Sequence, residues 1–142
     1  MTPALRTSGL SKKFGGLAAV SDVSLVLPVG ARHALIGPNG AGKTTLINLL
    51  TGVIEPTAGD VFLHEERVTP LGQHRRVKRG LTRTYQINAL FPGLTVRESV
   101  VLAILERKGL AARWVKPVAG YREEKDEAMA LLATLNLERD AE

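Results

Sequence analysis

The sequence predicts an α/β fold, with an antiparallel β region at its start and the beginning of a helical part near its end. Residues 4–14 and 20–27 are rich in Val, Leu, Ser and Thr, and a Gly15-Gly16 turn signal separates them. Residues 32–50 then show the pattern of a short apolar strand, a glycine-rich loop and a helix. These two patterns together favour a sheet with at least one helix packed against it.

The first strand, residues 4–14, and the second, residues 20–27, are expected to pair through the glycine turn. Residues 32–36 form the predicted apolar strand before the glycine loop. A helix is expected over residues 44–50, because Leu46, Ile47, Leu49 and Leu50 recur at helical spacing. The turn signals of residues 55–59 precede a short strand expected at residues 60–63.

The second half of the chain contains the expected helices. The basic segment 73–79 favours a helix that ends at Gly80, and residues 81–85 favour a strand. Thr95 and Glu98 form a capping box, which predicts a helix to about Lys108. A last helix is expected over residues 121–137. Its apolar face is expected to consist of Ala128, Leu131, Leu132 and Leu135.

Composition limits the class of protein. A chain of 142 residues with 44% hydrophobic and 23% charged side chains is typical of one globular domain. It contains no cysteine, which excludes disulfides, thiolate zinc sites and cysteine nucleophiles. We expect neither a secretion leader nor a membrane span, since no apolar run approaches the ~20 residues that a bilayer requires. Nineteen basic against 14 acidic residues favour a polyanionic ligand, which could be a phosphate chain, a nucleic acid or an anionic lipid.

One loop has a specific chemical pattern. Residues 37–44 read Gly-Pro-Asn-Gly-Ala-Gly-Lys-Thr and match G-x-x-x-x-G-K-[ST] between a predicted strand and a predicted helix. Glycines allow phosphates to approach the backbone N–H groups, and the helix start adds a positive dipole end. Lys43 is expected to contact the β- and γ-phosphates, Thr44 to bind Mg²⁺ and Thr45 to donate to the α-phosphate. The expected nucleotide-binding residues are Gly37, Pro38, Asn39, Gly40, Ala41, Gly42, Lys43, Thr44 and Thr45.

Three stretches carry a family resemblance. They are IGPNGAGKTTLINLLTG at residues 36–52, SKKFGGLAAVSDVSL at 11–25 and RTYQINALFPGLTVRESVVLA at 83–103. The chain resembles the N-terminal portion of an ATP-binding cassette (ABC) nucleotide-binding domain, a P-loop NTPase fold, and is most similar to the branched-chain amino acid importer ATPases. On this resemblance residues 4–93 are the β and P-loop core portion and residues 94–142 the start of the helical subdomain.

The resemblance implies further site residues and partners. Phe14 matches the aromatic that stacks on adenine, for which a core position is the alternative. Gln86 matches the glutamine that contacts Mg²⁺ or the attacking water, so it is expected to be a metal ligand and a catalytic residue. Residues 85–92 correspond to a loop that contacts the membrane subunit. The implied partners are a second ABC ATPase domain in a homo- or heterodimer, transmembrane permease subunits and, indirectly, a substrate-binding protein, at the cytoplasmic face of the inner membrane.

Several family motifs are missing from the 142 residues. They contain no LSGGQ-like signature loop, no Walker B strand of apolar residues ending in Asp-Glu, and no evident switch histidine. Val100 to Leu105 followed by Glu106 imitates a Walker B strand, but it falls within the capping-box helix, so Glu106 is expected to be a surface carboxylate. We therefore expect a truncated ABC domain that binds ATP and Mg²⁺ but does not hydrolyse ATP by itself.

Two other functional classes remain open. Arg75, Arg76, Lys78, Arg79 and Arg83 form a basic cluster that a nucleic-acid-binding P-loop module would use. No aromatic side chains interleave the cluster, so a solvated helix face is the favoured interpretation and no specific nucleic acid is expected as a partner. A small-molecule kinase would share the phosphate loop. A GTPase would add Asn-Lys-x-Asp, which does not occur.

Overall fold

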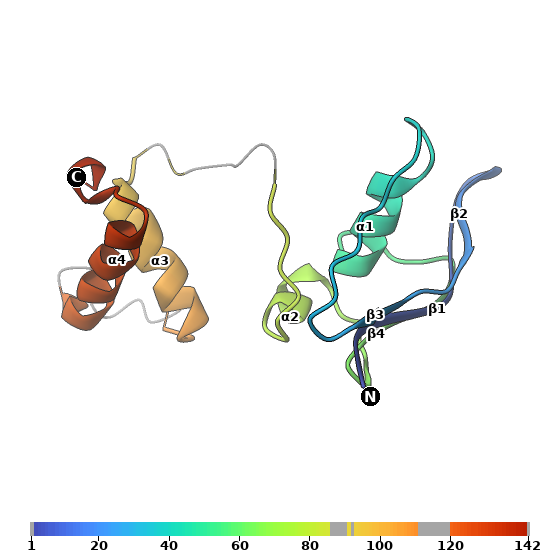
Figure 1. Cartoon of the computed structure of the whole chain (residues 1–142), viewed down its shortest axis with the longest axis horizontal. Helices are drawn as coiled ribbons and strands as arrows, with labels where there is room; N and C mark the ends of the chain where they lie inside the picture. Colours follow the sequence, from blue (N-terminus) through green and yellow to red (C-terminus); the bar gives the residue numbers. More distant parts are fainter. Residues whose placement is uncertain (1, 86–90, 92, 111–119, 142) are drawn as a thin grey trace. The chain divides into compact units, whose positions relative to one another are not determined.

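The computed structural model describes residues 2–85, 91, 93–110 and 120–141. The chain divides into two compact units, residues Met1–Thr84 and Tyr85–Glu142 (Figure 1). The domain division expected at residue 93 stays a prediction.

The first unit is built on an antiparallel sheet. Its long strand β1 (Pro3–Phe14) pairs with β2 (Leu17–Val23), β3 (Val26–Pro28) and β4 (Ala58–Leu63). The short strand β5 (Glu66–Arg67), which the sequence pattern does not indicate, pairs with β4. All of these pairings are antiparallel, as the sequence predicts for this region.

The single strand expected at residues 20–27 is two strands. Thr7 on β1 explains the interruption, because its buried hydroxyl donates to the carbonyl of Val23 and accepts from the amide of Leu25, at 2.8 and 3.0 Å. A side-chain hydroxyl therefore takes the place of two ladder hydrogen bonds. Asp22, with a φ of 50°, marks the irregularity on β2.

Helix α1 (Lys43–Thr51) covers the sheet, and its leucines enter the core. Leu49 is fully buried, and Leu46 and Leu50 are nearly so. The remaining members of the core cluster come from the strands and the segment after β5: Leu5, Leu10, Val20, Val61, Leu63 and Val68. The short helix α2 (Gln73–Val77) follows. Burial of this apolar surface contributes about 25 cal/mol of stabilisation per Å² and keeps α1 packed on the sheet.

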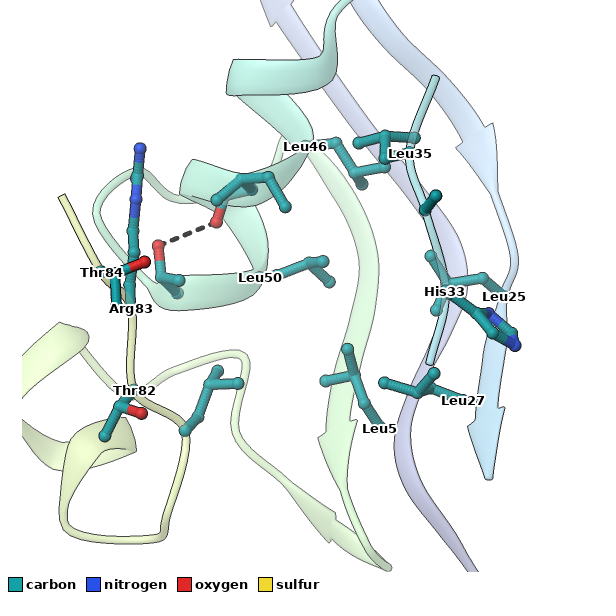
Figure 2. A pocket seen from close by; sticks show the side chains of 14 residues that line it. Leu5, Leu25, Leu27, His33, Leu35, Leu46, Leu50, Thr82, Arg83 and Thr84 are labelled. Atoms are coloured by element: carbon teal, nitrogen blue, oxygen red, sulfur yellow. Dashed lines mark hydrogen bonds between the residues drawn. The ribbon is translucent and has the colours of Figure 1, made fainter. Parts of the chain in front are cut away.

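The prediction of strands at residues 32–36 and 81–85 is wrong, because neither segment is a strand in the structure. A strand requires a hydrogen-bonded neighbour, and the described residues offer none to either segment. Between them lies a cavity of about 550 Å³ lined mainly by apolar side chains, among them Leu5, Leu25 and Leu27 from the strands and Leu46 and Leu50 from α1 (Figure 2). The apolar pattern therefore marks the walls of a cavity instead of paired strands.

The second unit contains α3 (Val96–Arg107), α4 (Arg122–Thr134) and the 3₁₀ turn η2 (Glu138–Asp140). The capping box is confirmed: the Thr95 hydroxyl accepts from the Glu98 amide, and the Glu98 carboxylate accepts from the Thr95 amide at 2.9 Å. Glu106 is exposed, as expected. None of the helices within the described ranges is long and apolar enough to cross a membrane.

The apolar face predicted for the last helix is only partly correct. Ala128 and Leu132 are buried, but Leu131 and Leu135 are 46% and 66% exposed. The two buried residues are four apart and so share one stripe of α4, whereas the exposed pair lies on the neighbouring stripe. Tyr121 and the α3 residues Val101, Ile104 and Leu105 complete the small core of this unit.

Candidate functional site

The N-terminus of α1 is open, and this is the basis of the candidate site. Its N-cap residue is Gly42, no side chain caps the helix, and no acidic residue occupies its first turn. Helix α3, in contrast, has a capping box and an acidic residue in its first turn. The first amides of a helix have no partner within the helix, so the start of α1 presents N–H donors and a positive dipole end. This arrangement is suited to an anion.

Lys43, the first residue of α1, contacts the loop that precedes it. Its Nζ donates to the carbonyls of Gly37 and Pro38 at 2.7 and 2.6 Å. The loop residues 37–41 are exposed, as is Thr44, while Thr45 is half-buried. The ammonium group of Lys43 and the uncapped amides of α1 therefore lie next to the same accessible loop. The sequence predicts the phosphate contacts at this place.

Two glycines set the course of the loop. Gly40 and Gly42 have φ values of 81° and 82°, a region that side chains with a Cβ rarely adopt. Gly42 also lies against β2, where a Cβ would stand 2.3 Å from the carbonyl oxygen of Ala19. The glycine pattern thus has a packing reason in addition to access for phosphate.

Phe14 ends β1 and pairs with Leu17 across the glycine turn. Its side chain is 50% exposed, which is inconsistent with the alternative of a core aromatic. The Nζ of Lys12 lies 5.3 Å from the ring centre and donates to the carbonyl of Glu55 at 2.7 Å. One cation therefore stands by the ring while the hairpin presents Phe14 to solvent.

The solvated helix face expected for the basic cluster is wrong at Arg76. This residue is 1% exposed. Its Nη1 donates to the carbonyls of Leu49 and Leu50, both at 2.7 Å, its Nε to Leu71 and its Nη2 to Thr69. Burial lowers the pKa of Arg76, yet a guanidinium stays charged in proteins.

Arg76 is therefore the cation at the C-terminal end of α1, a helix with no basic residue in its own last turn. Sequence reasoning missed it, because nothing local distinguishes Arg76 from the exposed Arg75 beside it.

Two further arginines of the cluster contact side chains of the first unit. Arg79 pairs with Glu66, with 2.6 Å between Nε and Oε1, and Arg83 donates from Nη1 to Oδ1 of Asn48 at 2.6 Å. Together with Arg76, these arginines show that much of the cluster is engaged within the chain. This arrangement weakens the interpretation of the cluster as a nucleic-acid surface.

Some expected site residues lie outside the described residues. Gln86 is one of them, and so are Ala89, Leu90 and Pro92 of the expected docking loop. The flanking aromatic residues Tyr85 and Phe91 are 44% and 60% exposed. Across the described ranges, no group of three or more His, Asp or Glu side chains could hold a metal. Thr44 is accessible at the start of α1, which fits Mg²⁺, an ion that commonly uses few protein ligands beside phosphate oxygens.

The comparisons with known proteins agree on a family. The profile described as "ABC transporter" matches residues 20–142. The high-affinity branched-chain amino acid transport ATP-binding protein LivG of Salmonella typhimurium is 40% identical over 134 residues, covering 93% of this chain and 52% of that protein. BraF of Pseudomonas aeruginosa, which has the same description, is 39% identical, with 92% and 52% covered. The chain spans about half the length of these curated relatives.

Solved structures show the same fold. The ADP conformation of MJ1267, an ATP-binding cassette of an ABC transporter, has a TM-score of 0.79 at 28% identity, covering all of this chain and 57% of that one. A dimeric post-hydrolysis state of the cassette MJ0796, bound to ADP and Pi, has a TM-score of 0.70 at 25% identity, with 96% and 60% covered.

Proposed function

This chain belongs to the ABC transporter family, and from that premise we propose that it is the ATP-binding portion of an importer ATPase for branched-chain amino acids. The observation that carries the proposal is the open N-terminus of α1, where Lys43, the loop glycines and uncapped amides meet. The solute is suggested by the names of the relatives, LivG and BraF. Relatives described as ribose importers also match, so the solute depends on those names and not on the site.

The residues of the loop have distinct parts in this proposal. The amides at the start of α1 and the Nζ of Lys43 bind the phosphate chain, which requires Lys43 to exchange the carbonyls of Gly37 and Pro38 for phosphate oxygens. Thr44 holds Mg²⁺, with Gln86 as a second ligand, and the ion when bound neutralises charge on the phosphates. Phe14 stacks on the adenine ring.

Assembly and location follow from the same family membership. We propose a second ABC ATPase domain as one partner, an arrangement for which the dimeric MJ0796 structure is the support. Transmembrane permease subunits are the other direct partner, with a substrate-binding protein acting through them. The chain would then work at the cytoplasmic face of the membrane as a peripheral subunit.

Nucleotide and DNA binding separate this proposal from its main alternative. The chain should bind ATP in titration calorimetry and show no strongly salt-dependent binding to random-sequence DNA. Salt-dependent DNA binding without ATP binding would instead favour the nucleic-acid module.

A further inference from the structure

The exposed ring of Phe14 has a cation of its own strand over one face. The Nζ of Lys12 lies over the ring at 5.3 Å from its centre, within the ~6 Å range of a cation–π contact. Lys12 and Phe14 are two positions apart near the end of β1, a spacing that places side chains on the same side of a strand. One face of the ring therefore meets the ammonium group, while the side chain as a whole stays half-exposed.

A second contact fixes the position of this ammonium group. The Nζ of Lys12 donates to the carbonyl of Glu55 at 2.7 Å, in the turn that follows α1. A charged donor makes a stronger hydrogen bond than a neutral one. Lys12 is half-buried, whereas the neighbouring Lys13 is exposed. Two adjacent lysines therefore have different surroundings, and it is Lys12 that reaches both the ring and the turn.

The turn that contains Glu55 is attached to both β1 and α1. On the side of β1, the amide of Thr57 donates to the carbonyl of Ser11 at 2.8 Å. On the side of α1, the amide of Val53 donates to the carbonyl of Asn48 at 2.9 Å. The carbonyl that accepts from Lys12 is therefore held in place relative to the helix whose first residues form the proposed phosphate site.

Fixing the ring has a consequence for a ligand that stacks on it. A half-exposed aromatic side chain at the end of a strand must be ordered when a base binds, and this ordering reduces the affinity unless it is already present in the free protein. The contact with Lys12 provides that order beforehand. It also occupies one face of the ring, which leaves the opposite face to the base.

We propose that Lys12 is a positioning residue for the base of the nucleotide. Its ammonium group, held by the carbonyl of Glu55, fixes the ring of Phe14 and covers one face, so that the base stacks on the other. The inference rests on the proposed function, in which Phe14 stacks on adenine.

The test measures how much the base contributes to binding, expressed as the ratio of the Kd of inorganic triphosphate to the Kd of ATP in titration calorimetry. Lys12→Met keeps the length of the side chain but removes the ammonium group. We expect it to lower the ratio roughly two- to five-fold, the lower part of the range for ordering one side chain on binding. The Kd of triphosphate should not change, because the proposed role concerns the base alone.

Two further variants of the lysines serve as matched controls. Lys12→Arg keeps a cation that can stack on an aromatic ring and donate to a carbonyl, so it should retain most of the ratio. Lys13→Met removes the same charge one position further along β1 and keeps the backbone amide that donates to the hydroxyl of Thr57 at 3.0 Å. It should leave the ratio at the value of the parent.

A double variant identifies the route of the effect. In a Phe14→Ala background, Lys12→Met should cause no further fall of the ratio, because Lys12 acts through the ring. An equal fall in that background would overturn the inference, and so would equal weakening of ATP and triphosphate, which would make Lys12 a cation for the phosphates.

Thermal unfolding and the parent chain separate the remaining outcomes. A lower melting temperature of Lys12→Met with an unchanged ratio would mean that Lys12 only stabilises the hairpin, and the inference would be wrong. Absence of ATP binding by the parent, or an unchanged ratio in Phe14→Ala, would overturn the proposed function together with the inference. A ratio that depends on Phe14 but not on Lys12 would overturn the inference alone.

Discussion

The backbone of Gly42 lies against Ala19 so closely that a Cβ on the glycine would stand 2.3 Å from the alanine carbonyl oxygen. Ala19 belongs to β2, which pairs with the part of β1 that ends in Phe14. The residue that caps α1 therefore contacts the hairpin that presents the aromatic ring. This contact connects the proposed phosphate-binding and base-binding elements through a single glycine.

Gly42→Ala and Gly40→Ala form a matched pair that tests this contact. Both glycines have φ near 80°, so both alanines incur roughly 1–2 kcal/mol of backbone strain. Only the alanine at 42 would also collide with Ala19, since nothing lies within 4 Å of a Cβ at 40. We expect Gly42→Ala to lower the melting temperature distinctly more than Gly40→Ala. If the two variants lost the same amount of melting temperature, β2 would have to move away from the added methyl group without a measurable loss of stability.

Phe14→Ala should weaken binding of ATP and GTP to a similar extent, by about 1–3 kcal/mol, because stacking depends on the face of the base and not on its edge. Inorganic triphosphate, which has no base, should bind to the variant and the parent alike. The half-exposed ring contributes little to the core, so thermal unfolding should change little. A lower melting temperature with unaltered ATP affinity would contradict the stacking role.

Arg76→Met should destabilise the first unit by at least about 3 kcal/mol in urea unfolding, because it removes four hydrogen bonds from a charged donor and leaves buried carbonyls unpaired. Arg75→Ala, one position earlier and exposed, serves as the control and should be within about 0.5 kcal/mol of the parent. Similar stabilities for the two variants would mean that α1 does not need a cation at its C-terminal end.

The strong local patterns were sufficient to predict much of the fold. The β1–β2 turn, α1 and the capping box of α3 each depend on neighbouring residues, so the sequence predicts them correctly. Residues 32–36 and 81–85 are different, because a strand exists only where another strand pairs with it. The local sequence pattern can indicate that a segment suits a strand, but it does not show which other segment would pair with it.

The same distinction applies to the site. The residues of the phosphate loop form a contiguous motif and could be predicted without coordinates. Burial of Arg76 depends on carbonyls at positions 49, 50, 69 and 71, which come together only in the folded chain. The contact of Gly42 with Ala19 and that of Arg83 with Asn48 are also long-range, so no motif reveals them.

The 142-residue chain should bind Mg·ATP without hydrolysing it. Phosphoryl transfer needs an oriented nucleophile and stabilisation of developing charge, and the 142 residues contain neither a Walker B carboxylate nor a signature loop. Because such groups act as a unit, the parts that are present give little catalysis alone. A phosphate-release assay should find no more turnover for the parent than for Lys43→Ala. Turnover that scales with the amount of parent chain, and is absent in the variant, would show that catalytic parts were overlooked.

The central claim is that the loop before α1 binds phosphate. The most direct test is titration of ATP into the parent chain and into the Lys43→Ala variant. Removal of Nζ leaves the helix amides in place but removes the mobile positive charge that the β- and γ-phosphates would meet, so we expect a loss of at least about ten-fold in affinity. Lys125→Ala, which removes the same charge from α4, should bind ATP like the parent. Equal ATP affinity in the parent and Lys43→Ala, with both proteins folded, would contradict the phosphate-binding role of the loop.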